Sequence, residues 1–100
     1  MIALKVNDKD NVATVFTQNV SSGSNVRVID KKGNEENVVS CDDVPYGHKI
    51  AIENIQKGSK IIKYGETIGA AIIDIKKGEH AHVQNIESLR GRGDLGGGNN

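Results

Sequence analysis

The stretch that determines the fold is residues 44–85, which read VPYGHKIAIENIQKGSKIIKYGETIGAAIIDIKKGEHAHVQN. Within it, short aliphatic segments alternate with glycine-centred turns. The pattern aliphatic, two residues, glycine, two residues, aliphatic occurs at 55–61 and, more loosely, at 75–81, and an earlier copy lies at 20–26. Because glycine tolerates positive φ, each copy predicts a tight turn between two extended segments. The repeat therefore favours a compact, corner-rich β structure over a flat meander.

The composition agrees with a small β domain. The chain has 100 residues, no tryptophan and only three aromatic residues. Isoleucine and valine dominate its apolar residues, and β-branched side chains suit pleated sheet. A core this small often gains stability from a partner surface. The formal net charge is zero, whereas a generic nucleic-acid-binding module carries a basic excess, so a nucleic-acid partner is not expected.

The cellular compartment is predicted from what the sequence lacks. A single cysteine, Cys41, cannot form an internal disulfide, which fits a reducing environment. No apolar run approaches the length of a membrane span, so no membrane partner is expected. The first residues, 1–5, do not resemble a signal peptide. We expect a cytoplasmic protein.

Periodicity predicts the individual elements. Valines and a phenylalanine at helical spacing predict one short helix near 11–18, with aspartates before it as caps. Residues 65–69 read as a glycine-bounded bend, and the nearly continuous apolar run 70–75 reads as a strand buried on both faces. The remaining predicted strands are 2–6, 26–29, 37–40, 49–53, 60–64 and 80–83.

The end of the chain differs from the rest. Five glycines and two final asparagines crowd residues 90–100, and such a segment cannot bury enough apolar surface to order alone. We expect one ordered domain over 1–89 and a flexible glycine-rich tail over 90–100, or an arm that orders on a partner.

Histidines are the strongest candidates for chemistry. His80 and His82 alternate along a predicted strand, so they share one face and could pinch a metal or an anion, while Ala81 and Val83 take the other face. An isolated pair at this spacing is a weak signal, because a closed metal site needs three or four ligands; two solvated histidines are the alternative. His48 lies at a strand start, where a structural role with a backbone carbonyl is equally compatible.

Cationic and aromatic residues suggest how a substrate could be held. Lys49, Lys63 and Arg90 could bind carboxylates, and Tyr64 beside a glycine could contact a ligand, although each is also compatible with an exposed charge or a core position. Cys41 has no basic neighbour to activate its thiol and is expected to be buried or incidental.

A run of motifs resembles a known family. Gly47-His48-Lys49-Ile50-Ala51, Ile62-Lys63-Tyr64-Gly65-Glu66, and Gly78-Glu79-His80-Ala81-His82 followed by Asn85 occur in this order. They resemble the SAF domain of the altronate/galactarate dehydratase family, sugar-acid lyases that include sulfolactate sulfo-lyase. The resemblance covers roughly residues 2–90. One departure is Gln84, where many relatives carry a third histidine.

This resemblance implies a fold and an activity. The fold would be a β-clip, and the chain would be a small lyase subunit that acts with a large catalytic subunit, is inactive alone and could form a homo-oligomer. The reaction would remove water or sulfite from a sugar acid or sulfonated hydroxy-acid, with a divalent metal, iron (Fe2+) or Mn2+. His48, His80 and His82 would be catalytic, with His80 and His82 binding metal. The substrate would contact Lys49, Lys63, Tyr64, Asn85 and Arg90.

Two other interpretations remain open at the level of sequence. A non-catalytic SAF or β-clip binding module would not need the paired histidines. An orphan domain that has lost its catalytic partner is also compatible with Gln84.

Overall fold

A computed structural model of the protein describes residues 1–89, and these residues form short β-strands and turns without a helix. The prediction of a mostly β fold is therefore confirmed. No described residue belongs to a helix that could cross a membrane. The strands are β1 (Ile2–Leu4), β2 (Val12–Val15), β3 (Asn25–Ile29), β4 (Glu35–Val39), β5 (Lys49–Ala51), β6 (Lys60–Lys63), β7 (Glu66–Ala71), β8 (His80–Ala81) and β9 (Ile86–Ser88).

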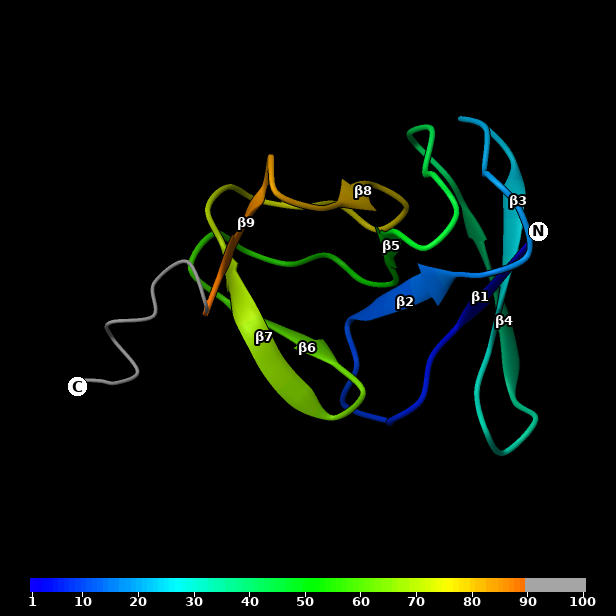
Figure 1. Ribbon diagram of the computed structural model, residues 1–100, viewed down its shortest axis with the longest axis horizontal. Coiled ribbons are helices and arrows are strands. Elements are labelled where there is room, and N and C mark those ends of the chain that lie inside the picture. Colours follow the sequence, from blue (N-terminus) through cyan, green and yellow to red (C-terminus); the bar gives the residue numbers. More distant parts are fainter. Residues whose placement is uncertain (90–100) are drawn as a thin grey trace.

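The strands form two sheets. Six strands pair in the order β4-β3-β1-β2-β5-β8, in which only β1 and β3 run parallel, and three strands pair antiparallel as β6-β7-β9. In Figure 1, β1, β3 and β4 lie at one end of the molecule and β6, β7 and β9 at the other. Strands β5 and β8 lie between these ends (Figure 1); His80 is the first residue of β8, whereas His48 directly precedes β5 and His82 directly follows β8.

Glycine-centred corners connect these short strands. The three predicted copies are confirmed as tight turns, and residues 44–50 form a fourth copy that was not predicted. In every copy the central glycine has φ between 86° and 96°. A backbone bond of 2.9–3.0 Å from the residue after each glycine to the residue two before it closes the turn. Positive φ at this position is what glycine supplies at little cost.

The four corners associate in two pairs. Val20 pairs with Val44, and Ile55 pairs with Ile75, each through two reciprocal N–H···O bonds of 2.7–2.8 Å. An asparagine or aspartate precedes each of these aliphatic residues, and its side-chain oxygen accepts a bond of 2.7–2.9 Å from a backbone N–H of the opposite turn. These four acceptors are Asn19, Asp43, Asn54 and Asp74.

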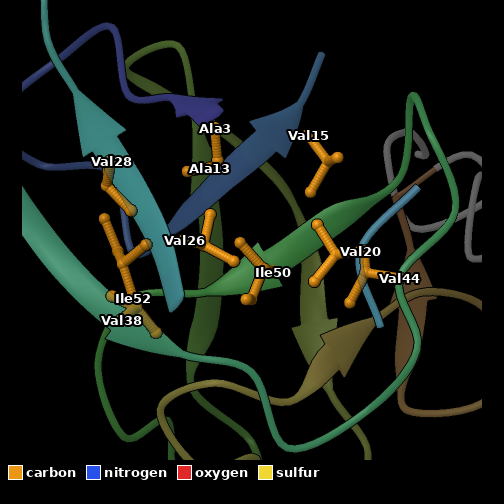
Figure 2. Packing of buried hydrophobic residues seen from close by; sticks show 10 residues of the cluster. All are labelled: Ala3, Ala13, Val15, Val20, Val26, Val28, Val38, Val44, Ile50 and Ile52. Carbon is orange, nitrogen blue, oxygen red and sulfur yellow. The ribbon is translucent and has the colours of Figure 1, made fainter. Parts of the chain in front are cut away.

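The hydrophobic core has two clusters that correspond to the two corner pairs. Figure 2 shows the first, in which Ile50 lies among valines from β2, β3, β4 and the first two corners. The second contains Ile55, Ile61 and Ile75, packed with partly buried side chains of β7 and β9. Strand β5 supplies both, because Ile50 belongs to the first cluster and Ala51 to the second. Because successive side chains of a strand point to opposite faces, β5 contributes one residue to each cluster and so connects the two clusters.

The helix predicted near 11–18 is wrong, because this segment contains strand β2. Strand β2 lies between β1 and β5 and bonds to both. Val12, Ala13 and Val15 are all buried because β2 lies between two other strands. Phe16, in contrast, is 41% exposed. Long-range pairing has therefore overridden the local helical spacing.

Three further boundaries differ from the expectations. The bend predicted at 65–69 is a turn at Tyr64 and Gly65, followed by strand β7. The run 70–75 is not a strand buried on both faces, since β7 ends at Ala71 and the next two isoleucines are 41% and 53% exposed. Strand β8 ends at Ala81, so Val83 does not share its buried face and is 76% exposed. The other predicted strands overlap β1, β3, β4, β5 and β6.

Candidate functional site

Three histidines meet where β5 and β8 pair. His48 follows the turn glycine of the second corner, and its N–H bonds to Pro45 O at 3.0 Å. His80 begins β8 and pairs with Ile50 of β5, and His82 follows the end of β8. The structure thus brings His48 to the pair that the sequence singled out, across 32 positions of the chain.

The three imidazoles form a compact cluster. His48 Nδ1 and His80 Nε2 are 2.9 Å apart and share a hydrogen bond. The His48 and His82 rings stack with centroids 4.1 Å apart, and one ring nitrogen from each histidine lies within 4.8 Å of the others. All three side chains are partly buried. Three converging imidazole nitrogens could hold one metal ion and leave further coordination positions open.

The surroundings of His80 and His82 lower the pKa of both side chains and so favour their neutral forms. Burial lowers the pKa of His80, and the neighbouring His48 and His82 lower it further, against an opposing effect of Asp42. Burial, His48 and Lys49 likewise lower the pKa of His82. Neutral imidazole is the form that binds metals and that can accept a proton, so these shifts prepare the cluster for either use.

Polar side chains hold the backbone around the histidines. Asp42 Oδ2 accepts a bond of 2.9 Å from His80 N–H. Asn85, which is 5% exposed, accepts from His82 N–H at 2.9 Å and donates to His80 O at 2.8 Å. Through these two bonds the Asn85 amide positions the segment that carries His80 and His82, and a contact between Asn85 and substrate stays a prediction.

Gln84 also contacts the cluster, from a turn that follows strand β8. Residues 82–85 form a turn, and this turn brings Gln84 Nε2 to 3.1 Å from His80 O and 3.3 Å from His80 Nδ1. The amide therefore bonds to the ring nitrogen of His80 that faces away from His48. The Gln84 side chain therefore contacts His80 on the side of its ring that does not contact His48.

Lysines make the surface beside the histidines cationic. Lys49 and His82 both line a hollow of about 120 Å³, together with apolar side chains of β7 and β9. Burial lowers the pKa of Lys49, and the charge of Lys63 lowers it further. Lys63 Nζ lies 4.8 Å from the centroid of the Tyr64 ring. This surface suits an anion next to the cluster.

Some predicted candidates lie elsewhere. Arg90 lies outside the described residues. Cys41 is exposed, so the first of the two expectations for this thiol, burial, is wrong, whereas an incidental thiol stays a prediction; its Sγ lies 3.6 Å from Lys77 O. Conversely, Asp42 and Thr14 were not predicted as residues of the site; Thr14 contacts Tyr64. No local spacing links either residue to its partner, so only the tertiary structure reveals them.

Comparisons with known proteins place the chain among its relatives. Residues 1–89 match the family described as the altronate/galactarate dehydratase SAF domain. The altronate dehydratase of Escherichia coli K12 is 38% identical over 85 residues, which is 85% of this chain and 16% of that protein. The galactarate dehydratase (L-threo-forming) of the same organism is 33% identical over 76 residues, 75% of this chain and 13% of that enzyme.

A separate subunit is also similar. The (2R)-sulfolactate sulfo-lyase subunit alpha of Chromohalobacter salexigens is 41% identical over 49 residues, 49% of this chain and 52% of that subunit. The chain thus spans about one sixth or less of the two dehydratases and about half of the sulfo-lyase subunit. Because the family match covers all the described residues, the chain belongs to the altronate/galactarate dehydratase SAF domain family.

Proposed function

We propose that this chain is the small subunit of a dehydratase or lyase that eliminates water or sulfite from a hydroxy-acid. A large subunit would carry most of the catalytic body. The observation that carries the proposal is the cluster of His48, His80 and His82 in a member of this family. The relatives are two hydro-lyases and one subunit alpha of a sulfo-lyase, a name that implies a second subunit in that protein. The sharp glycine corners support a β-clip as the fold.

The histidine cluster fits a divalent metal. Three imidazole nitrogens within 4.8 Å of one another, from histidines of which two have lowered pKa values, are a suitable donor set for a divalent transition metal, and the proposed ions to test first are iron and manganese. A bound metal would act as a Lewis acid on an oxygen of the hydroxy-acid. His48, His80 and His82 would all be ligands, which adds His48 to the pair proposed from the sequence.

The other residues would bind and orient the substrate. The ammonium groups of Lys49 and Lys63 would attract its carboxylate, and the hollow beside His82 would admit part of its carbon chain. In the absence of metal, a neutral imidazole of the cluster would instead serve as a base that accepts a proton from the substrate. Arg90 is retained as a proposed substrate contact. The enzyme would work in the cytoplasm.

Reconstitution with the partner tests this function. The tagged chain would be used to recover its large subunit from native cell extract, with mass spectrometry identifying a dehydratase-like protein. The purified complex would then be assayed for keto-acid formation from altronate, galactarate and sulfolactate with Fe2+ or Mn2+. We expect activity from the complex and none from the isolated chain, since 100 residues offer only part of a site.

Variants connect that activity to the site. His82→Ala should lower keto-acid formation roughly a hundredfold or more while the complex stays intact, because a proton-transfer or metal-binding group is lost. Lys57→Ala, on the remote third corner, is the control and should retain activity. A tight complex without activity on any hydroxy-acid, or full activity in His82→Ala, would instead favour a non-catalytic binding module.

A further inference from the structure

Tyr64 occupies a backbone conformation that its side chain disfavours. Its φ is 55°, and no other non-glycine residue among 1–89 has positive φ. Tyr64 and Gly65 form the two-residue turn between Lys63 and Glu66, which pair across β6 and β7. Turns with positive φ at both positions favour Asn-Gly, and a bulky residue at the first position is strained. Packing does not explain the tyrosine, because its side chain is 47% exposed.

The surrounding structure holds this strained turn in place. Asp10, which is 2% exposed, accepts the Gly65 N–H through Oδ1 at 2.8 Å. Next to it, Asn11 accepts from Ile62 N–H and donates to Lys60 O, both at 2.8 Å. These bonds span 49–55 positions of the chain, so the β6–β7 hairpin has a defined position against the start of β2. Backbone strain that the surroundings enforce is commonly found at functional sites.

The hydrogen bonds of Asp10 and Asn11 to the hairpin place the Tyr64 hydroxyl beside the cationic surface. Tyr64 Oη lies 3.4 Å from Thr14 Oγ1, and Thr14 pairs with Lys49 across β2 and β5. Lys63 Nζ lies over the Tyr64 ring. Within residues 1–89 neither Lys49 nor Lys63 forms a salt bridge. Two uncompensated ammonium groups and a phenol hydroxyl complement the charge and the acceptor oxygens of a carboxylate.

We propose that Lys49, Lys63 and the Tyr64 hydroxyl form a carboxylate-binding subsite, and that the strained turn is retained because it presents Tyr64 there. The ligand is a carboxylate of the hydroxy-acid that the histidine cluster would process, so the inference rests on the proposed function. Lys49 connects the two parts, because it lines the same hollow as His82. The subsite binds and orients substrate, whereas the chemistry belongs to the histidines.

Opposite effects on stability and binding test this proposal in the full chain. In Tyr64→Asn, relief of strain should raise the thermal midpoint by about 4–8 °C. The same variant should weaken binding of galactarate, measured by NMR titration of the ¹⁵N-labelled protein, roughly tenfold through loss of a charge-assisted hydrogen bond. Tyr64→Phe should lose the same affinity without a change in midpoint, because it keeps the ring and the strain.

Matched controls make the result specific. Tyr46→Asn changes another exposed tyrosine before a turn glycine, but one with ordinary φ, so its midpoint should not rise. Lys57→Ala should bind galactarate like the wild type. A lower midpoint in Tyr64→Asn, unchanged affinity in both Tyr64 variants, or no wild-type binding of galactarate would each overturn the proposal.

Failure of the subsite and failure of the proposed function remain distinguishable. If the complex with the large subunit is active but both Tyr64 variants keep the wild-type KM, the subsite is wrong and the function stands. If galactarate binding depends on Tyr64 but the complex forms no keto acid, the subsite stands and the lyase function is wrong.

Discussion

At the scale of single residues, Asp10 shows how one buried carboxylate organises distant segments. Its Oδ2 accepts from Val6 N–H at 3.1 Å and Asn7 N–H at 3.0 Å, while Oδ1 accepts from Gly65 N–H. Burial raises the pKa of Asp10, but the backbone hydrogen bonds from Gly65, Asn7, Val6 and Tyr64 outweigh it and hold the pKa below its ordinary value. The sequence had suggested a helix cap here, yet Asp10 connects the first loop to the β6–β7 turn.

The pH dependence of stability should reveal this carboxylate. Since its pKa is lower in the folded chain, its contribution is complete above about pH 4 and is lost as pH falls through the folded pKa. Asp10→Asn should lower the free energy of unfolding by about 1–3 kcal/mol at pH 7. Urea unfolding should show a smaller difference from the wild type at pH 3. Asp8→Asn, at an exposed salt bridge, is the control with almost no effect; an equal deficit at both pH values would contradict the role of the charge.

Gln84 should influence metal binding without being a ligand. Its amide bonds to His80 O and lies against His80 Nδ1, and partners that orient a ligating histidine typically change metal affinity 10–100-fold. We therefore expect Gln84→Ala to weaken Co²⁺ binding by about that factor, measured by absorption titration. Gln56→Ala, on an exposed corner, should bind like the wild type. Equal affinity in Gln84→Ala would mean that the amide does not orient the ring.

At the scale of elements, the glycine corner is the unit from which the fold is built. Each corner reverses the chain with one positive-φ glycine, buries an aliphatic residue on either side and pairs with a second corner. Two corners also introduce the histidines, since His48 comes one residue after Gly47 and His80 two residues after Gly78. The element that makes the fold compact therefore also assembles the candidate site.

The corners should differ in their tolerance of a methyl group. Gly58→Ala has open space around the added Cβ and should cost only the conformational strain, about 1–2 kcal/mol. In Gly78→Ala the Cβ would also overlap Val39 O and approach Cys41 Sγ at 3.2 Å, which should add about 1–3 kcal/mol. Urea unfolding of the two variants side by side measures this difference, and equal losses would show that strain alone determines the cost.

At the scale of the whole molecule, the histidine cluster lies where the two halves of the protein join. Strand β5 contributes to both hydrophobic clusters and pairs with β8. His48 enters from the β5 side, whereas His80 and His82 come from the β8 side. A ligand that bridges them would therefore link chain segments more than 30 positions apart.

Metal binding should consequently stabilise the entire fold. At a metal concentration one hundred times the dissociation constant, the free energy of unfolding should rise by about 2.7 kcal/mol, because the unfolded chain cannot gather the three histidines. Thermal unfolding with Mn²⁺, and again after chelation with EDTA, measures the effect and its reversal. His82→Ala should lose the stabilisation, and Cys41→Ser should keep it, since the exposed thiol lies outside the cluster. Stabilisation that survives in His82→Ala would point to another binding site.

Some features of this protein were determined by the sequence itself. The glycine spacing predicted three of the four corners, and the excess of β-branched residues predicted a mostly β fold, because turn geometry and strand preference are local properties. The family motifs predicted the histidines and lysines of the candidate site. Local reasoning could not exclude a helix near 11–18, since the same valine spacing suits a strand once its neighbours are present.

Only the tertiary structure decided how the site is assembled. The meeting of His48 with His80, the support from Asp42, Gln84 and Asn85, and the position of the Tyr64 hydroxyl all depend on contacts between distant segments or on one tight turn. The strand register and the hydrogen bonds accepted by the Asp10 and Asn11 side chains determine these contacts. Such pairings depend on hydrogen bonds across 30–55 positions, for which no spacing within the sequence provides a signal.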